Sequence, residues 1–145
     1  MPRLLLATSN LGKIKEYRLL LDDLGYQITT LAEQGISKTT TELGNSYEQN
    51  AQWKALSASK SSQLITLADD SGLEVDALSG EPGIHSARFA GKDATDTDKV
   101  RVLLARLHGV PREKRTAHFK CVIAIATSKG QLELYHGECH GIIAF

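Results

Sequence analysis

The sequence predicts an α/β protein with a mixed sheet flanked by helices. Short apolar runs of strand length precede amphipathic helical patterns along the earlier part of the chain, which is the alternation expected of strands and crossover helices. Towards the end, apolar and polar residues alternate on both sides of a turn, as in an antiparallel hairpin. No internal repeat or low-complexity linker divides the 145 residues. We therefore expect residues 1–145 to form a single domain.

The chain opens with a predicted strand, turn and helix. Leu4 to Ala7 form an apolar run, and residues 8–12 have turn-forming character. Gly25 is expected at the position that ends the helix. The apolar face of this helix is predicted to consist of Ile14, Tyr17, Leu21 and Leu24.

The start of this helix carries residue types that suit a phosphate group. Ser9, Asn10, Gly12 and Lys13 would present backbone amides, polar side chains and one cation to the same point. The pattern is not a Walker A loop, because that motif needs glycine at Ala7. An ordinary helix N-cap with a solvated lysine accounts for the same residues and remains the alternative.

A second strand and a second helix are predicted next. Gln27–Leu31 indicates a weak strand, and Ala32–Leu43 indicates a polar loop. Ser46 and Gln49 have the spacing of a capping box that opens a helix running to about Lys60. Its narrow apolar stripe is formed by Tyr47, Ala51, Ala55 and Ala58.

The segment from Leu64 to Gly91 is the predicted active centre. Leu64–Ala68 suits a strand buried on both faces, and Asp69 and Asp70 follow where that strand is expected to end. Ligands of α/β sheets collect beyond the carboxyl ends of strands, so these acids are expected at a cleft rim. Neighbouring side chains of an extended segment point to opposite faces, so one acid can face a ligand while the other braces the loop. An Asx-type turn at Asp-Asp-Ser-Gly is the alternative.

A third helix and a hairpin complete the predicted elements. Leu73 and Val75 continue a strand into the Gly-Pro-rich loop Ser79–Gly83. Thr95 and Asp98 form a second capping box. The predicted apolar face of the following helix consists of Val100, Leu103, Leu104 and Leu107, and Gly109 and Pro111 stop it. The hairpin pairs residues 117–125 with residues 132–135, and residues 142–145 are expected to begin a further strand.

The composition narrows the class of function. Seventeen basic and seventeen acidic side chains give a net charge of zero, which argues against a broad electrostatic surface for nucleic acid. No apolar run approaches the length of a membrane span, so we expect a soluble cytoplasmic protein without membrane contact. Cys121 and Cys139 are too few for a disulfide framework and are expected to be reduced and partly buried.

Four landmarks in order resemble the inosine triphosphate pyrophosphatase family over the whole chain. They are Ala7-Thr8-Ser9-Asn10 with Gly12-Lys13 and Glu16; Glu42 with Gly44; Asn50-Ala51 with Lys54-Ala55; and Ala68-Asp69-Asp70-Ser71-Gly72-Leu73 with Val75, Leu78, Gly80, Pro82-Gly83 and Ser86-Ala87-Arg88. The resemblance implies an elongated fold with a cleft between two lobes, a homodimer and dependence on Mg²⁺. It also implies hydrolysis of non-standard purine nucleoside triphosphates (ITP, dITP, XTP) to monophosphate and pyrophosphate, which removes them from the nucleotide pool.

The resemblance also implies roles for individual residues. Glu42 and Asp70 would bind the metal, Asp70 would also be the catalytic base, and Ser71 would touch substrate. The triphosphate would be held by Thr8, Ser9, Asn10, Leu11, Gly12 and Lys13. Apart from the resemblance, Asn50, Lys54, Asp69 and Arg88 are candidate supporting residues, and Arg88 would either contact phosphate or pair with a carboxylate. Oxygen ligands such as Glu42 and Asp70 suit Mg²⁺, and water between a carboxylate and a metal is more easily deprotonated.

Two departures from the family pattern limit this expectation. Gln49 replaces a glutamate that the family usually has, so a charge near the metal is lost. The chain stops at Phe145, before a Phe-Gly-Tyr-Asp segment and a later lysine and Ser-His-Arg segment of the family, so most of the purine-reading half is expected to be absent. The alternatives are therefore a nucleotide-binding protein of the same fold without turnover, and an inactive shortened form whose exposed strand edge drives self-association.

Overall fold

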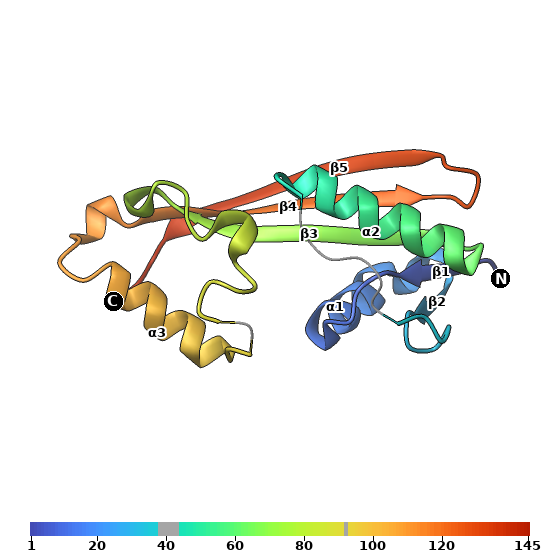
Figure 1. Cartoon of the computed structure of the whole chain (residues 1–145), viewed down its shortest axis with the longest axis horizontal. Coiled ribbons are helices and arrows are strands. Elements are labelled where there is room, and N and C mark those ends of the chain that lie inside the picture. The colour runs from blue at the N-terminus through green and yellow to red at the C-terminus, as the bar shows by residue number, and fades with distance from the viewer. Residues whose placement is uncertain (38–43, 92) are drawn as a thin grey trace. The chain divides into compact units, whose positions relative to one another are not determined.

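The computed structural model describes residues 1–37, 44–91 and 93–145. Its elements in chain order are β1 (Arg3–Leu6), α1 (Leu11–Leu21), η1 (Asp22–Leu24), β2 (Gln27–Thr30), α2 (Tyr47–Ser62), β3 (Ile65–Val75), η2 (Asp76–Leu78), η3 (Gly83–His85), α3 (Asp96–Arg106), η4 (Arg112–Lys114), β4 (Thr116–Ala126) and β5 (Leu132–Ile142) (Figure 1). None of the helices in these ranges has the length and hydropathy needed to cross a membrane.

The strands form one five-stranded sheet in the order β2-β1-β3-β4-β5. β1 pairs in parallel with both neighbours, so that Leu5 lies opposite Thr29 of β2 and Thr66 of β3. Only residues 127–131 join β4 to β5, and a connection this short requires an antiparallel pair. The predicted α/β class with a mixed sheet is confirmed.

The chain divides into two compact units. Unit 1 consists of Met1–Asp70 and Val122–Tyr135, and unit 2 consists of Ser71–Cys121 and His136–Phe145. β3, β4 and β5 therefore each contribute residues to both units. The expectations of a single domain and of a cleft between two lobes remain predictions.

The core of unit 1 lies between α1 and the sheet. Leu4, Leu6 and Leu67 form its buried centre, and the residues packed against them are Ile14, Tyr17, Leu21, Ile28, Ile123 and Ile125. Leu24 was expected on the same helix face but is 61% exposed. The reason is that α1 ends at Leu21 and the chain tightens into η1 before Gly25, whose φ is +74°.

α2 has the predicted stripe, and its first turn differs from the predicted capping box. Tyr47, Ala51, Ala55 and Ala58 are all buried, as expected. Ser46 caps the helix by accepting a hydrogen bond from the Gln49 N–H (3.1 Å). Gln49 Oε1, however, accepts from the N–H of Asn45 (2.9 Å). The reciprocal bond therefore reaches one residue further back than a capping box requires.

The core of unit 2 lies between α3 and the sheet. Val75, Leu103, Leu107 and Ala117 are its buried residues. The capping box of Thr95 and Asp98 is complete, with hydrogen bonds of 3.1 and 3.0 Å in the two directions. Val100 was predicted on the buried face but is 56% exposed.

The end of the chain differs from prediction. β5 continues to Ile142, so the expected separate strand over residues 142–145 is wrong. The last residues are instead held by Arg115, which is only 4% exposed. Its guanidinium donates to the carbonyls of Leu107, Val110 and Ala144 and lies 4.1 Å from the centre of the Phe145 ring. These bonds tie the chain end to the residues that follow α3.

β4 has two covered faces in its second half, which simple alternation does not predict. Ile123 and Ile125 pack on the core of unit 1, as the alternation requires. Val122, Ala124 and Ala126 point the other way and are buried as well. In the first half of β4, Phe119 was predicted on the apolar face but is 59% exposed.

Both cysteines are free thiols, as expected, but Cys139 is exposed rather than partly buried.

Candidate active site

The two acids of the predicted active centre lie inside β3 rather than after its end. This corrects the expected strand boundary and rules out the Asx-type turn. Parallel pairing with β1 ends at Leu6 and Leu67, but β3 also neighbours β4 and stays extended. Asp69 and Asp70 therefore project from β3 just past the point where β1 stops, which keeps them at the carboxyl end of the parallel strands.

Asp69 and Asp70 are both only 4% exposed and are held by different helices. Asp69 accepts hydrogen bonds from Lys13 Nζ (3.1 Å) and Tyr17 Oη (2.8 Å) of α1. Asp70 Oδ2 accepts from Asn50 Nδ2 (2.9 Å) of α2. Neighbouring residues of a strand point to opposite faces, so one carboxylate braces α1 while the other is presented to α2.

Lys13 forms an ion pair with Asp69. The Lys13 side chain is 26% exposed and the Asp69 side chain 5% exposed, so the predicted alternative of a solvated lysine is wrong. An ammonium has three donors, and the contact with Asp69 takes one of them. Tyr17 completes the site around Asp69, although sequence reasoning placed it only on an apolar face. Its spacing of four residues from Lys13 was the available signal, since residues four apart share a helix face.

The predicted phosphate-binding loop is an ordered N-cap. Thr8 Oγ1 accepts from the Asn10 N–H, and Asn10 Oδ1 accepts from the Lys13 N–H, both at 3.1 Å. Asn10 is thus the N-cap of α1. Ser9, Leu11 and Gly12 are exposed. The first N–H groups of a helix lack intrahelical acceptors, so this exposed turn has the geometry for an anion as well as for a simple cap.

Asn50 connects Asp70 with the main chain before α2. It is 2% exposed, and its Oδ1 accepts from the Gly44 N–H at 2.8 Å. A Cβ added to Gly44 would lie 2.5 Å from this Oδ1, so only glycine permits the contact. Lys54, predicted as a supporting residue on the same helix face, lies one turn further along α2 and is half-buried.

The predicted metal ligands lie only partly within the described residues. Glu42 lies outside them, and the described ranges contain no group of three or more His, Cys, Asp or Glu residues suited to a metal ion. Asp69 already binds Lys13 and Tyr17 through both oxygens. Asp70 supplies an oxygen ligand, and Mg²⁺ is commonly held by one or two carboxylates plus substrate phosphates. The donor chemistry of Asp70 with Glu42 therefore fits Mg²⁺.

Two predicted residues belong to unit 2. Ser71 follows Asp70 and is half-buried. Arg88 is exposed, and its N–H donates to the carbonyl of His85 within the loop after η3. Ser86 fixes this loop, because its Oγ accepts from the Leu73 N–H (2.9 Å) and donates to the Gly83 carbonyl (2.6 Å).

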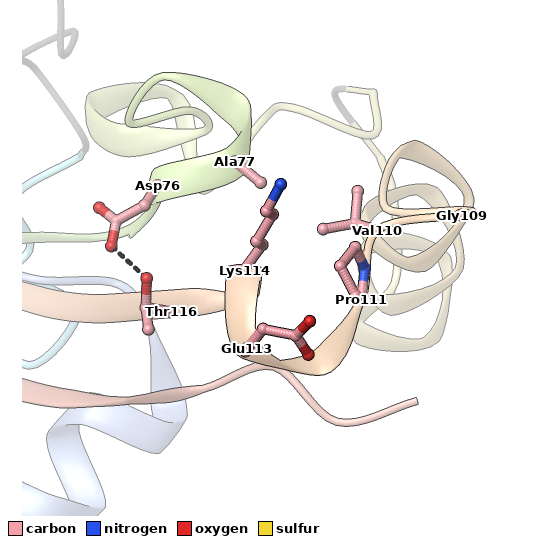
Figure 2. Close-up of a pocket in the computed structure, with 8 residues that line it drawn as sticks. All are labelled: Asp76, Ala77, Gly109, Val110, Pro111, Glu113, Lys114 and Thr116. Atoms are coloured by element: carbon pink, nitrogen blue, oxygen red, sulfur yellow. Dashed lines mark hydrogen bonds between the residues drawn. The ribbon is translucent and has the colours of Figure 1, made fainter.

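Unit 2 also carries an open pocket that contains none of the predicted site residues. Figure 2 shows Lys114 directed between the side chains of Ala77 and Val110, with Asp76 bound to the Thr116 hydroxyl (2.6 Å) at one side. The lining mixes both charges with apolar groups and offers no cluster of carboxylates. The acids and amides described above make unit 1 the better candidate.

A model of the Ham1 family matches residues 4–145. The chain belongs to the Ham1 family. This confirms the resemblance inferred from the four landmarks. Curated relatives include the dITP/XTP pyrophosphatase of Desulforamulus reducens, which is 48% identical over 141 residues, covering 97% of this chain and 70% of that protein. Those of Photobacterium profundum and Bacillus subtilis are 49% and 38% identical, and each match covers 99% of this chain and 73% of the relative.

Solved Ham1 structures share the fold. The Ham1 protein of Coxiella burnetii superposes with a TM-score of 0.87 at 36% identity, covering 99% of this chain and 74% of that one. A nucleoside-triphosphatase / dITP/XTP pyrophosphatase of Mycobacterium abscessus gives a TM-score of 0.80 at 36% identity, covering 98% and 74%. The mixed α/β fold is therefore that of this family.

Proposed function

We propose that this Ham1-family chain is a nucleoside triphosphate pyrophosphatase that hydrolyses dITP, XTP and ITP to the monophosphate and pyrophosphate. Relatives at 38–49% identity are dITP/XTP pyrophosphatases. The observation that carries the proposal is the separation of two adjacent buried acids, with Asp69 bound to Lys13 of α1 and Asp70 bound to Asn50 of α2. This arrangement gives the two carboxylates different tasks.

Each residue has a role in this reaction. Asp70 accepts the proton of a water molecule, whose oxygen attacks the α-phosphorus while pyrophosphate leaves. The exposed first turn of α1, from Thr8 to Lys13, binds the phosphate oxygens, and Ser71 contacts substrate. Asp69 and Tyr17 hold Lys13 beside that turn. The transition state spreads negative charge over phosphate oxygens, so amides and one ammonium stabilise it.

Asp70 and Glu42 would bind Mg²⁺. The ion supplies charge neutralisation for the phosphates and makes a bound water more acidic. Asp70 and Glu42 are both carboxylates, which are oxygen ligands of the kind that Mg²⁺ prefers. Lys54 and Arg88 are proposed as supporting cations. A homodimer and a cytoplasmic location belong to the same proposal.

Asp70→Asn tests the assignment of the base. Pyrophosphate release from ITP, dITP, XTP and ATP is measured with Mg²⁺, by converting the product to phosphate with an inorganic pyrophosphatase. We expect the wild-type chain to act on ITP, dITP and XTP but not on ATP, and EDTA to abolish turnover. Asp70→Asn should lower the rate by about 100-fold or more, since a general base contributes about that much, while ITP binding persists.

Asp23→Asn is the matched control, because Asp23 is exposed on η1 and should leave the rate unchanged. Turnover that survives Asp70→Asn would show that another group is the base. A wild-type chain that binds ITP but releases no pyrophosphate would favour the alternative of a nucleotide-binding protein without turnover.

A further inference from the structure

The Asn50 amide makes a contact at each end. Nδ2 donates to Asp70 Oδ2 at 2.9 Å, and Oδ1 accepts from the Gly44 N–H at 2.8 Å. Both side chains are nearly fully buried, at 2% and 4% exposure. A side-chain amide has its acceptor and its donors on different atoms. Asn50 therefore joins a carboxylate of β3 to the main chain just before α2, and glutamine or aspartate cannot reproduce this with the same geometry.

The position of Asn50 is itself well fixed. Ser46 caps the first turn of α2, and the neighbouring Ala51 is fully buried. The Asn50 N–H donates to the Ser46 carbonyl at 3.2 Å. These contacts order the first turn of α2, so the backbone that carries the Asn50 amide has a fixed position.

A carboxylate needs such an anchor if its oxygens are to be aimed. The terminal torsion of aspartate is broad rather than confined to staggered wells. A hydrogen bond to Oδ2 from a fixed donor selects one orientation, and thereby also sets the direction of Oδ1. The hydrogen bond from Asn50 therefore orients the Asp70 carboxylate.

We propose that Asn50 is a positioning residue that orients the Asp70 carboxylate and holds the main chain at Gly44 beside it. This inference rests on the proposed function, in which Asp70 binds the metal and accepts the proton. Gly44 supports it, because a Cβ there would approach Asn50 Oδ1 to 2.5 Å and Gln49 Cβ to 2.9 Å. The close approach of chain and amide exists only because position 44 has no side chain.

Two substitutions separate positioning from mere bracing of the chain. Asn50→Asp keeps an acceptor for the Gly44 N–H but replaces the donor to Asp70 by a second carboxylate oxygen. Asn50→Leu keeps a branched side chain with the same number of heavy atoms and removes both contacts. Asn50→Asp is expected to lower kcat both because the donor to Asp70 is lost and because two buried carboxylates repel each other. Asn50→Leu introduces no charge and therefore separates the loss of the donor from this repulsion.

The experiment measures kcat and KM for ITP with Mg²⁺, the affinity for Mn²⁺ without nucleotide by electron paramagnetic resonance, and the midpoint of thermal unfolding. Loss of a residue that orients a metal ligand typically costs about 10–100-fold in activity or metal affinity. We expect both variants to lose about that much kcat with little change in KM. Asn50→Leu should also bind Mn²⁺ about tenfold more weakly.

Gln52→Glu and Gln52→Leu are matched controls two residues along α2, and should match the wild type. Asn50→Asp with wild-type kcat would overturn the inference, and it does so even if Asn50→Leu fails to fold. Unchanged Mn²⁺ affinity in a folded Asn50→Leu would overturn it as well. If the wild-type chain hydrolyses ITP and the Asn50 variants do so with the wild-type kcat, this inference is wrong but the proposed function is not. If the wild-type chain has no turnover, the proposed function itself is wrong.

Discussion

At the scale of single residues, β3 shows how adjacent acids come to have different partners. That they face opposite ways could be predicted, because alternation along a strand is local. Their partners could not, since Lys13 and Tyr17 lie 56 and 52 residues away from Asp69 in the sequence. Asn50 is likewise 20 residues from Asp70. The candidate residues were thus predictable as a set, but the pairs among them required the fold.

The pair of Lys13 and Asp69 should be energetically coupled. Lys13→Met leaves the buried Asp69 carboxylate with Tyr17 as its remaining described donor, and Asp69→Asn leaves the ammonium without its counter-charge. Each change should cost about 1–3 kcal/mol in the free energy of unfolding, because a charge-assisted hydrogen bond is lost in a mostly buried site. The double variant should cost less than the sum of the two. Urea unfolding of all four proteins measures this.

Lys15→Met provides the control, since Lys15 is exposed on the same helix and should change stability by less than about 0.5 kcal/mol. Costs that simply add in the double variant would mean that the ion pair contributes nothing to folding.

At the scale of elements, helix starts were predictable where the signal is local, since Ser46 and Thr95 cap the predicted helices. Gly25 was predicted to end the first helix, but α1 ends at Leu21 and Gly25 instead ends the 3-10 helix η1 that follows. Predictions that depend on neighbours in space were wrong. β3 extends beyond its apolar run because β4 lies beside it in the sheet. Val100 has the sequence spacing of the apolar face of α3, but its side chain is exposed. Periodicity alone does not say how far along a helix the core extends.

The capping box of α3 should give a pH-dependent contribution to stability. The Thr95 N–H donates to the Asp98 carboxylate, and this hydrogen bond holds the pKa of Asp98 below its ordinary value of 3.8. A group whose pKa is lower in the folded state stabilises the protein above its unfolded pKa. That stabilisation is lost as the pH falls below 3.8 and through the folded pKa.

Asp98→Asn should therefore lower the melting temperature at pH 7, and the difference should shrink in strongly acidic buffer. Thr95→Ala should cost about 1 kcal/mol, as other N-cap losses do. Thermal unfolding followed by circular dichroism measures both, with Asp93→Asn outside the helix as a control. A melting-temperature difference for Asp98→Asn that persists undiminished in acid would contradict the assignment.

At the scale of the whole molecule, the family was recognisable from sequence, but the residues at which the chain passes from one unit to the other were not. Each unit has its own core, around Leu6 and Leu67 in one case and around Leu107 and Ala117 in the other. The chain passes between the units within β3, β4 and β5. No sequence pattern marks these passages, because strand periodicity continues through each of them.

This connectivity predicts cooperative unfolding, since neither unit consists of one continuous segment. Leu6→Ala and Leu107→Ala, both at fully buried positions, should each cost about 2–5 kcal/mol. Both should lower the midpoint of one common transition. Denaturation monitored by circular dichroism and by the fluorescence of Trp53 checks this. Leu19→Ala, at a position that is 73% exposed, serves as control. Two separate transitions, each moved by only one variant, would contradict the prediction.

Arg115 has a practical consequence for work with this protein. Its guanidinium donates hydrogen bonds to the carbonyls of Leu107, Val110 and Ala144 and lies against the ring of Phe145. The backbone of residues 144–145 is therefore held to unit 2. A dye or spin label attached at Phe145 should report the motion of that unit rather than the independent motion of a flexible tail.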